Sequence, residues 1–172
     1  MYVEIVQDHN RQVWDERVRK GLLHTRVASD DEFKNPLKAI NGRGWITGGL
    51  EGKHVLCLAG GGGLQAPLYA AAGAHVTVVD ISQEMINQDN RIAQERGLKL
   101  KALVGSMDDL SMIENDSFDL VTQPVAHVIS PIFLRSTMRF LGFYEWEDII
   151  SANISNRLIS SQRQHPIQMA ML

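Results

Sequence analysis

The sequence predicts an α/β fold in which a parallel sheet carries helices on both faces. The first observation is an apolar segment, residues 54–59, that leads straight into the consecutive glycines 60–63. The second is another apolar segment, residues 75–80, that ends on an acid, Asp80. The third is the alternation of strand-like and helix-like patterns from residue 54 onward. Such alternation with short connections is typical of βαβ units with right-handed crossovers, which build a doubly wound parallel sheet.

Residues 1–52 are predicted to form a helical extension ahead of the sheet domain, which takes residues 53–172. In residues 9–23, apolar side chains recur at near-helical spacing among charged ones, which indicates an amphipathic helix. Residues 24–52 are polar and rich in glycine towards their end, so we expect a short helix and loops there.

The sheet domain is expected to alternate strands and helices in a fixed order. The expected elements are strand 54–59, helix 64–72, strand 75–80, helix 83–96, strand 99–104, strand 119–122, a mostly helical segment 131–150 and strand 157–161. Ser82 is expected to cap the second of these helices, because a serine hydroxyl accepts a hydrogen bond from an N–H of the first turn. Gly73 and Gly97 stand just past the two helices, where glycine commonly ends a helix.

The composition is that of a globular protein and excludes several classes. Of 172 residues, 44% are hydrophobic and 22% are charged, so one domain with a packed core is expected. The net charge of −3 provides no basic excess to neutralise phosphates, so no nucleic-acid partner is expected. The chain has a single cysteine and its histidines lack metal-ligand spacing, so neither a disulfide framework nor a metal site is expected.

The same sequence predicts a soluble protein of the cytoplasm. The longest apolar run, residues 68–74, is too short to cross a membrane. The first residues are too charged for a signal peptide, and a lone cysteine fits a reducing compartment. No membrane partner is therefore expected.

The glycine turn, which we define as residues 59–63, combines with Asp80 into the pattern of a nucleoside-cofactor pocket. Glycine lets the backbone turn tightly and approach a ligand, and the following helix presents unpaired N–H groups. An acid about 20 residues further on can bond the hydroxyls of a ribose. The spacing Gly61-x-Gly63-x-x-Ala66 also satisfies the dinucleotide fingerprint, so these residues alone leave the nucleoside open.

Three further features of the sequence distinguish between the candidate nucleoside cofactors. A long segment precedes the first strand, Gly-Ser-Met-Asp-Asp-Leu follows the third strand at 105–110, and the fourth strand runs into Gln-Pro-Val at 123–125. With these features the sequence resembles the class I S-adenosylmethionine-dependent methyltransferases over roughly residues 10–130. A bacterial small-molecule-type subgroup of that family has Leu-Cys-Leu-Ala-x-Gly-Gly-Gly at the turn, as here at 56–63. It also has Ala-Ala-Ala-Gly-Ala at the next helix end, as here at 70–74.

The resemblance implies a Rossmann-like fold, S-adenosylmethionine as the cofactor, and a lid formed by the N-terminal extension. The glycine turn would enclose the methionine part of the cofactor, and Asp80 would accept hydrogen bonds from the ribose hydroxyls. Ile81 and Met85 would flank the adenine. Residues 106–108 would meet the adenine edge, while residues 123–125 would line the methyl-transfer end. The implied cofactor-binding residues are Ala59, Gly60, Gly61, Gly62, Gly63, Asp80, Ile81, Met85, Ser106, Met107, Asp108, Gln123, Pro124 and Val125.

The implied reaction is methyl transfer to a small-molecule acceptor, for which the pattern assigns no catalytic residue. The sulfonium is already an activated methyl donor, so positioning supplies much of the acceleration, about 7–11 kcal/mol in well-oriented systems. A base is needed only where the acceptor must lose a proton. His127 is a candidate for that base, and a packing role is the alternative.

The C-terminal quarter of the chain departs from the family. A complete domain of this family has seven strands and the present chain provides about five, so the implied sheet is incomplete. Its fifth strand would be an exposed edge, so we expect a homo-oligomer or a partner that covers it. Two other functions stay open: an NAD(P)-dependent oxidoreductase domain, and a non-catalytic fragment that binds the cofactor or a partner protein.

Overall fold

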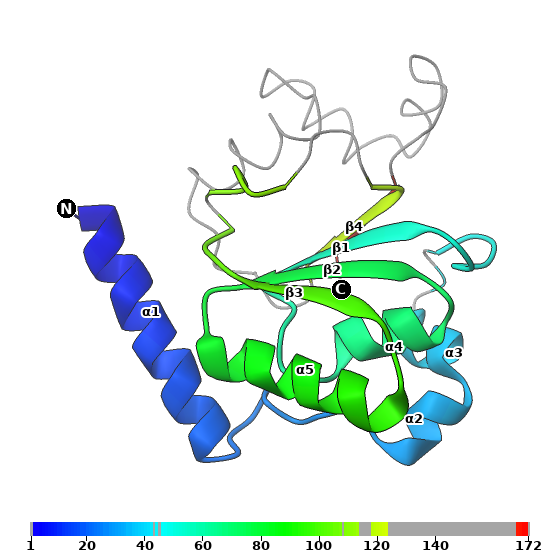
Figure 1. The fold of residues 1–172 in the computed structure, drawn as a ribbon, viewed down its shortest axis with the longest axis horizontal. Helices are drawn as coiled ribbons and strands as arrows, with labels where there is room; N and C mark the ends of the chain where they lie inside the picture. The colour runs from blue at the N-terminus through cyan, green and yellow to red at the C-terminus, as the bar shows by residue number, and fades with distance from the viewer. Residues whose placement is uncertain are drawn as a thin grey trace.

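The computed structural model describes residues 2–42, 44, 46–107, 109–113, 118–123 and 168–171. Five strands form one sheet in the order β3-β2-β1-β4-β5 (Figure 1). The strands are β1 His54–Leu58, β2 His75–Asp80, β3 Leu100–Val104, β4 Leu120–Gln123 and β5 Gln168–Met171. Each strand pairs in parallel with its neighbours, which confirms the predicted α/β class and its parallel sheet.

The described helices are α1 Tyr2–Arg19, α2 Asp30–Lys34, α3 Pro36–Ile40, α4 Gln65–Ala71 and α5 Gln83–Arg96. Helix α4 connects β1 to β2 and α5 connects β2 to β3, and both lie below the strands in Figure 1, with α2 and α3 next to α4. Helix α1 stands at the side of the molecule and contacts α5. The segment 131–150, which was predicted to be helical, lies outside the described residues.

Strand β1 is the buried centre of the sheet. Its last four side chains, at 55–58, are 0% exposed. Val55 and Cys57 pack towards the helices, while Leu56 and Leu58 pack on the opposite face with residues that follow β3. Both faces of β1 are therefore covered, as is usual for the central strand of a parallel sheet.

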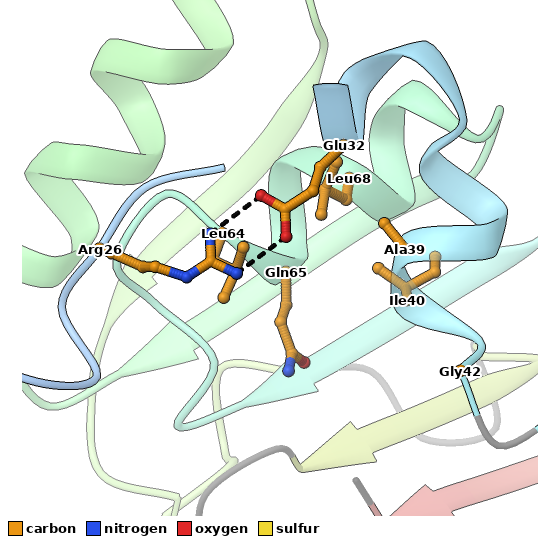
Figure 2. A pocket seen from close by; sticks show the side chains of 8 residues that line it. All are labelled: Arg26, Glu32, Ala39, Ile40, Gly42, Leu64, Gln65 and Leu68. Atoms are coloured by element: carbon orange, nitrogen blue, oxygen red, sulfur yellow. Dashed lines mark hydrogen bonds and ion pairs between the residues drawn. The ribbon is translucent and has the colours of Figure 1, made fainter. Parts of the chain in front are cut away.

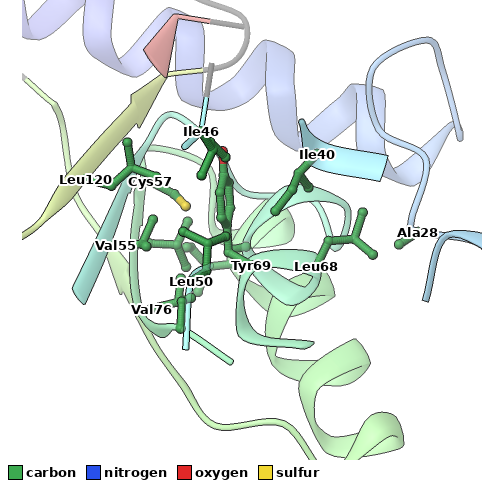
Figure 3. Packing of buried hydrophobic residues seen from close by; sticks show 14 residues of the cluster. Ala28, Ile40, Ile46, Leu50, Val55, Cys57, Leu68, Tyr69, Val76 and Leu120 are labelled. Atoms are coloured by element: carbon green, nitrogen blue, oxygen red, sulfur yellow. The ribbon is translucent and has the colours of Figure 1, made fainter. Parts of the chain in front are cut away.

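Tyr69 of α4 is the largest fully buried side chain on the helix-covered face (Figure 3). Its ring packs in one cluster with Cys57 and Leu120 from the sheet and Leu68 from its own helix. Its hydroxyl donates a hydrogen bond to Oγ1 of Thr122 on β4, at 3.4 Å. Burial raises the pKa of Tyr69 to about 12, so the side chain is uncharged at neutral pH. Its ring and hydroxyl join α4 to the sheet.

The predicted helix 9–23 is wrong at both ends, because α1 begins at Tyr2 and ends at Arg19. Its end is explained by Gly21, which has φ 60°. The N–H of Gly21 donates to the carbonyl of Val18, and the N–H of Leu22 donates to that of Arg17, each at 3.0 Å. This pair of bonds is the Schellman arrangement, in which a left-handed glycine stops a helix.

The other predicted boundaries agree with the structure to within one residue, and β2 and α5 match fully. The hydroxyl of Ser82 accepts the N–H of Met85 at 3.1 Å, which confirms the predicted cap. Gly97 and Gly73 follow their helices with φ 64° and 94°. The region 24–52 holds two short helices where one was expected, because Ser29 and Asn35 each provide an N-terminal cap.

The predicted strand 157–161 lies outside the described residues, and the fifth strand that the structure describes is β5. Among the described residues, no helix is long and apolar enough to cross a membrane. The described residues also include no group of three or more side chains placed to hold a metal ion.

Candidate cofactor site at the glycine turn

The glycine turn lies where the strand order of the sheet reverses. Strand β1 is followed by β2 on one side and pairs with β4 on the other, and the carboxyl ends of strands at such a point form a crevice that binds ligands in α/β proteins. The turn begins at Ala59, whose N–H still donates to Val79 of β2 at 2.8 Å. Ala59 has φ 47°, a conformation that costs a non-glycine residue about 1 kcal/mol or more.

Three consecutive N–H groups of the turn bind acceptors within the protein. Gly61 donates to Oδ2 of Asp80 at 3.0 Å. Gly62 donates to the carbonyl of Met85 at 3.1 Å. Gly63 donates to Oδ1 of Asp89 at 2.7 Å. The turn is thus fixed by β2 and by the first two turns of α5.

Glycine is required at these positions because the backbone of the turn lies too close to neighbouring side chains to leave room for a Cβ. A Cβ on Gly61 would lie 2.9 Å from Cβ of Met85, and one on Gly62 would lie 2.9 Å from its sulfur. A Cβ on Gly63 would lie 2.9 Å from Cγ1 of Val27. The sequence predicts close approach to a ligand, and the structure adds close approach to α5 and to the segment before α2.

That segment, residues 25–28, holds the outer side of the turn. The N–H of Ala28 donates to the carbonyl of Gly63 at 2.9 Å. With its amide nitrogen facing the two carbonyls, Gln88 donates to Thr25 at 3.1 Å and to Gly62 at 2.7 Å. The N-terminal extension therefore takes part in shaping the turn.

Asp80 lies at the carboxyl end of β2, 6% exposed. Its Oδ1 accepts the N–H of Ser82 at 3.0 Å, while its Oδ2 accepts that of Gly61 at 3.0 Å. Burial raises the pKa of Asp80, and these hydrogen bonds oppose that rise. Each carboxylate oxygen has a second lone pair, so the group can still accept a hydrogen bond from a ligand hydroxyl.

The other predicted residues fall into three groups. Ile81 is half-buried next to Asp80, and Met85 is buried beneath the turn. Met107 and Gln123 lie close together, with Nε2 of Gln123 at 3.4 Å from the Met107 sulfur. The neighbouring Ser106 hydroxyl accepts a hydrogen bond from Gln7 of α1 at 3.1 Å. Asp108, Pro124, Val125 and His127 lie outside the described residues.

Two acids that sequence reasoning passed over also belong to this region. Asp89 is 0% exposed and supports Gly63 from α5. Asp15 of α1 accepts hydrogen bonds from the Ser82 hydroxyl at 2.6 Å and from the Glu84 N–H at 3.1 Å. The signal for Asp89 was present, because it lies on the apolar face of a predicted helix, where an acid is out of place.

A pocket of about 250 Å³ opens beside the start of α4 (Figure 2). Its lining residues are Arg26, Glu32, Ala39, Ile40, Gly42, Leu64, Gln65 and Leu68. Arg26 and Glu32 form a double ion pair across it, with N–O distances of 2.9 and 2.8 Å. That contact lowers the pKa of Glu32 to about 2, chiefly through the Arg26 hydrogen bond. None of the predicted site residues lines this pocket.

Comparison with known proteins identifies the family. A family described as a methyltransferase domain matches residues 55–141, half of the chain. The "Uncharacterized methyltransferase YbaJ" of Bacillus subtilis (strain 168) is 40% identical over 131 residues, 70% of this chain and 51% of that protein. A ubiquinone biosynthesis O-methyltransferase of Aromatoleum aromaticum is 35% identical over 116 residues, 64% of this chain and 49% of that protein. The chain thus spans about half the length of the curated relatives it matches.

The fold has solved counterparts as well. The structure of magnesium protoporphyrin IX methyltransferase from Synechocystis PCC 6803, determined with bound SAH, gives a TM-score of 0.59. The match covers 83% of this chain and 68% of that one at 19% identity, so this likeness concerns the fold alone. The family match and the 40% identity to a methyltransferase confirm the resemblance that the sequence predicts: this chain belongs to the methyltransferase domain family.

Proposed function

We propose that this chain binds S-adenosylmethionine at the glycine turn and transfers its methyl group to a small molecule. Family membership supports the cofactor and the reaction type. The observation that carries the proposal is the placement of Asp80, a buried carboxylate with spare acceptor capacity, against the turn. A carboxylate in that place suits the two hydroxyls of a ribose.

The hydrogen bonds of the turn favour this cofactor over a dinucleotide. A dinucleotide places its pyrophosphate on the N–H groups of the glycine turn and of the following helix. Here the N–H groups of Gly61, Gly62 and Gly63 already donate to protein acceptors, two of them on acids. S-Adenosylmethionine carries no pyrophosphate, so it does not require these N–H groups for that purpose. This disfavours the alternative of an NAD(P)-dependent oxidoreductase domain.

The remaining proposed roles are those that the resemblance to the family implies. Ile81 and Met85 would flank the adenine, residues 106–108 would meet its edge, and residues 123–125 would line the methyl-transfer end. The proximity of Met107 and Gln123 supports one common pocket at the ends of β3 and β4. His127 would serve as base for an acceptor that must lose a proton.

The extension, residues 1–52, is proposed to act as a lid. Its helix α1 reaches the carboxyl edge of the sheet at two points. Gln7 binds the Ser106 hydroxyl, and Asp15 binds Ser82 beside Asp80. A helix anchored in this way could cover the adenosine end of a bound cofactor.

For the acceptor, we propose an oxygen atom of a small molecule. The support is that several relatives are named ubiquinone biosynthesis O-methyltransferases. Turnover is measured as release of S-adenosylhomocysteine with a panel of phenols, amines and thiols. Cofactor binding without turnover for any of them would favour the alternative of a non-catalytic cofactor-binding fragment.

Calorimetric titration with S-adenosylmethionine, S-adenosylhomocysteine and NADH tests the cofactor. We expect both sulfur nucleosides to bind and NADH not to bind. Asp80→Asn should weaken binding about tenfold, since an amide is a poorer acceptor for the ribose hydroxyls than a carboxylate. Asp31→Asn, on the exposed surface of α2, is the matched control. Binding of NADH in place of the sulfur nucleosides would overturn the proposal.

A further inference from the structure

Asp89 is a carboxyl group sealed beneath the glycine turn. Its side chain is 0% exposed, on the face of α5 that also buries Met85, Ile86 and Ile92. Burying an ionised carboxylate without a cation is strongly unfavourable, so such a group either finds compensation or stays neutral.

The surroundings of Asp89 provide little compensation for a charge. Its Oδ1 accepts the Gly63 N–H, and its Oδ2 has no hydrogen-bond partner among the described residues. The titratable groups that face it are Cys57 from β1 and Asp80 from β2, and both are acids. Helix α4 carries no charged residue, and the only one on β3, Lys101, is exposed.

The remaining neighbour of α5, helix α1, directs its charges elsewhere. Its Asp15 and Arg19 contact Ser82 and Glu84 at the first turn of α5, and its Arg17 lies over the ring of Trp14 on α1 itself. Within the described part of the chain, no cation therefore pairs with Asp89. Burial is the main cause that raises the pKa of Asp89, to about 8; the N–H groups of Gly63 and Gly62 oppose the rise, and the charge of Asp80 adds to it. At neutral pH the side chain is mainly the uncharged acid.

The turn depends on one face of α5. Met85, Gln88 and Asp89 stand at helical positions i, i+3 and i+4, which place them side by side. Met85 accepts the Gly62 N–H through its carbonyl, Gln88 donates to the Gly62 carbonyl, and Asp89 accepts the Gly63 N–H. The contacts of Gln88 and Asp89 are both 2.7 Å long, and that of Asp89 is the only one of the three in which a side chain accepts an N–H of the turn.

We propose that Asp89 is the positioning residue of the glycine turn: as an uncharged acid it fixes Gly63 from beneath, and its ionisation weakens cofactor binding. Asp89 does this without lining the site. An ionised Asp89 places a second buried charge beside Asp80, which favours opening of the turn to water. The cofactor part of this inference rests on the function proposed above.

The first test compares cofactor affinity at pH 7 and pH 9. The wild-type dissociation constant for S-adenosylmethionine should rise roughly tenfold over this interval, because binding requires the protonated acid. Asp89→Asn keeps an acceptor for Gly63 and cannot ionise, so its affinity should stay within about twofold of wild type at pH 7 and remain flat to pH 9. Glu95→Gln, on the exposed face of α5, should follow the wild-type profile.

A second variant separates positioning from charge. Asp89→Leu has similar volume but no acceptor, so the Gly63 N–H loses its partner and affinity should fall about tenfold or more at both pH values. An Asp89→Leu protein that binds as tightly as wild type would overturn the proposal. So would an Asp89→Asn protein that keeps the wild-type pH dependence, even where the leucine variant fails to fold.

A third measurement needs no cofactor. The amide resonance of Gly63, followed by NMR in the free protein, should titrate with an apparent pKa near 8 in wild type and be constant in Asp89→Asn. A titrating amide in a protein that binds no S-adenosylmethionine would support the positioning role and refute the proposed function. A Gly63 resonance that is indifferent to both pH and substitution would refute the positioning role whatever the protein binds.

Discussion

At the scale of single residues, Gly63 combines a left-handed backbone with a closed environment. Its φ is 78°, and a Cβ would meet Val27 at 2.9 Å and Ile92 at 3.1 Å. Gly48 has nearly the same φ, 81°, with nothing within 4 Å of the added Cβ. The two positions therefore separate the backbone cost of an alanine from its packing cost.

We expect Gly48→Ala to lower the free energy of unfolding by about 1 kcal/mol, the usual cost of a left-handed alanine. Gly63→Ala should lower it by about 3 kcal/mol, because overpacking adds to that cost. Urea unfolding of both variants gives the comparison. Equal losses would mean that Val27 and Ile92 move aside freely.

The raised pKa of Asp89 makes the stability of the folded chain depend on pH. Its pKa is raised to about 8 in the folded chain from the ordinary value of 3.8, so the folded state binds more protons between these values. The free energy of unfolding should therefore fall as pH rises from 4 towards 8. Asp89→Asn should flatten this part of the profile, as measured by urea midpoints. The fall should persist in Glu95→Gln.

At the scale of elements, α1 completes the N-terminus of α5. Asp15 accepts hydrogen bonds from Ser82 and Glu84, and Arg19 forms an ion pair with Glu84 at 3.3 Å. These polar contacts join two helices that are far apart in the chain. The neighbouring Glu16 pairs with Lys20 on the exposed face of α1.

Asp15→Ala should cost about 1 kcal/mol of stability, a typical value for a lost helix cap. It should also speed hydrogen exchange of the amides at the start of α5. Glu16→Gln should leave both quantities unchanged, because exposed pairs contribute little. If the two variants behave alike, α1 is held by something other than this cap.

Most elements could be predicted from the sequence, because their signals are local. Ser82 and Gly97 delimit α5 by side-chain and backbone preferences that act within a few residues. The end of α1 was misjudged because apolar Leu22 continued the helical period after Gly21 had already stopped the helix. The site was predicted only in part. Asp80 was expected beside the turn, whereas the bond from Gly63 to Asp89 joins residues 26 positions apart and depends on how α5 packs.

At the scale of the whole molecule, the fully buried Cys57 reports on global unfolding. It is the single cysteine, it lies in the central strand, and burial raises the pKa of its thiol. Its reaction with a thiol reagent should be about a hundredfold or more slower in the native chain than in denaturant. A Cys57→Ala, Ser111→Cys protein provides the control, since Ser111 is exposed and should react at once. Fast native labelling of Cys57 would show that the sheet opens locally.

Strand β5 lies at one end of the strand order, where another chain could pair with the sheet. Within the described residues its only neighbour is β4, so it forms one edge of the sheet. We propose that this edge pairs with a second copy or another protein, as unpaired strand edges tend to do. Size-exclusion chromatography with light scattering should then give more than the monomer mass, increasing with concentration. A monodisperse monomer at every concentration would contradict the proposal.

The hydrogen bonds of the glycine turn have a thermodynamic consequence. The turn is held by hydrogen bonds to Asp80, Met85 and Asp89 of the same chain, so its conformational entropy is already lost when the protein folds. A ligand that enters this site meets a backbone already in its final shape and does not have to order it. Such a ligand can bind tightly although it makes few contacts. The entropic penalty of its binding is smaller than that of a ligand around which a flexible loop has to fold.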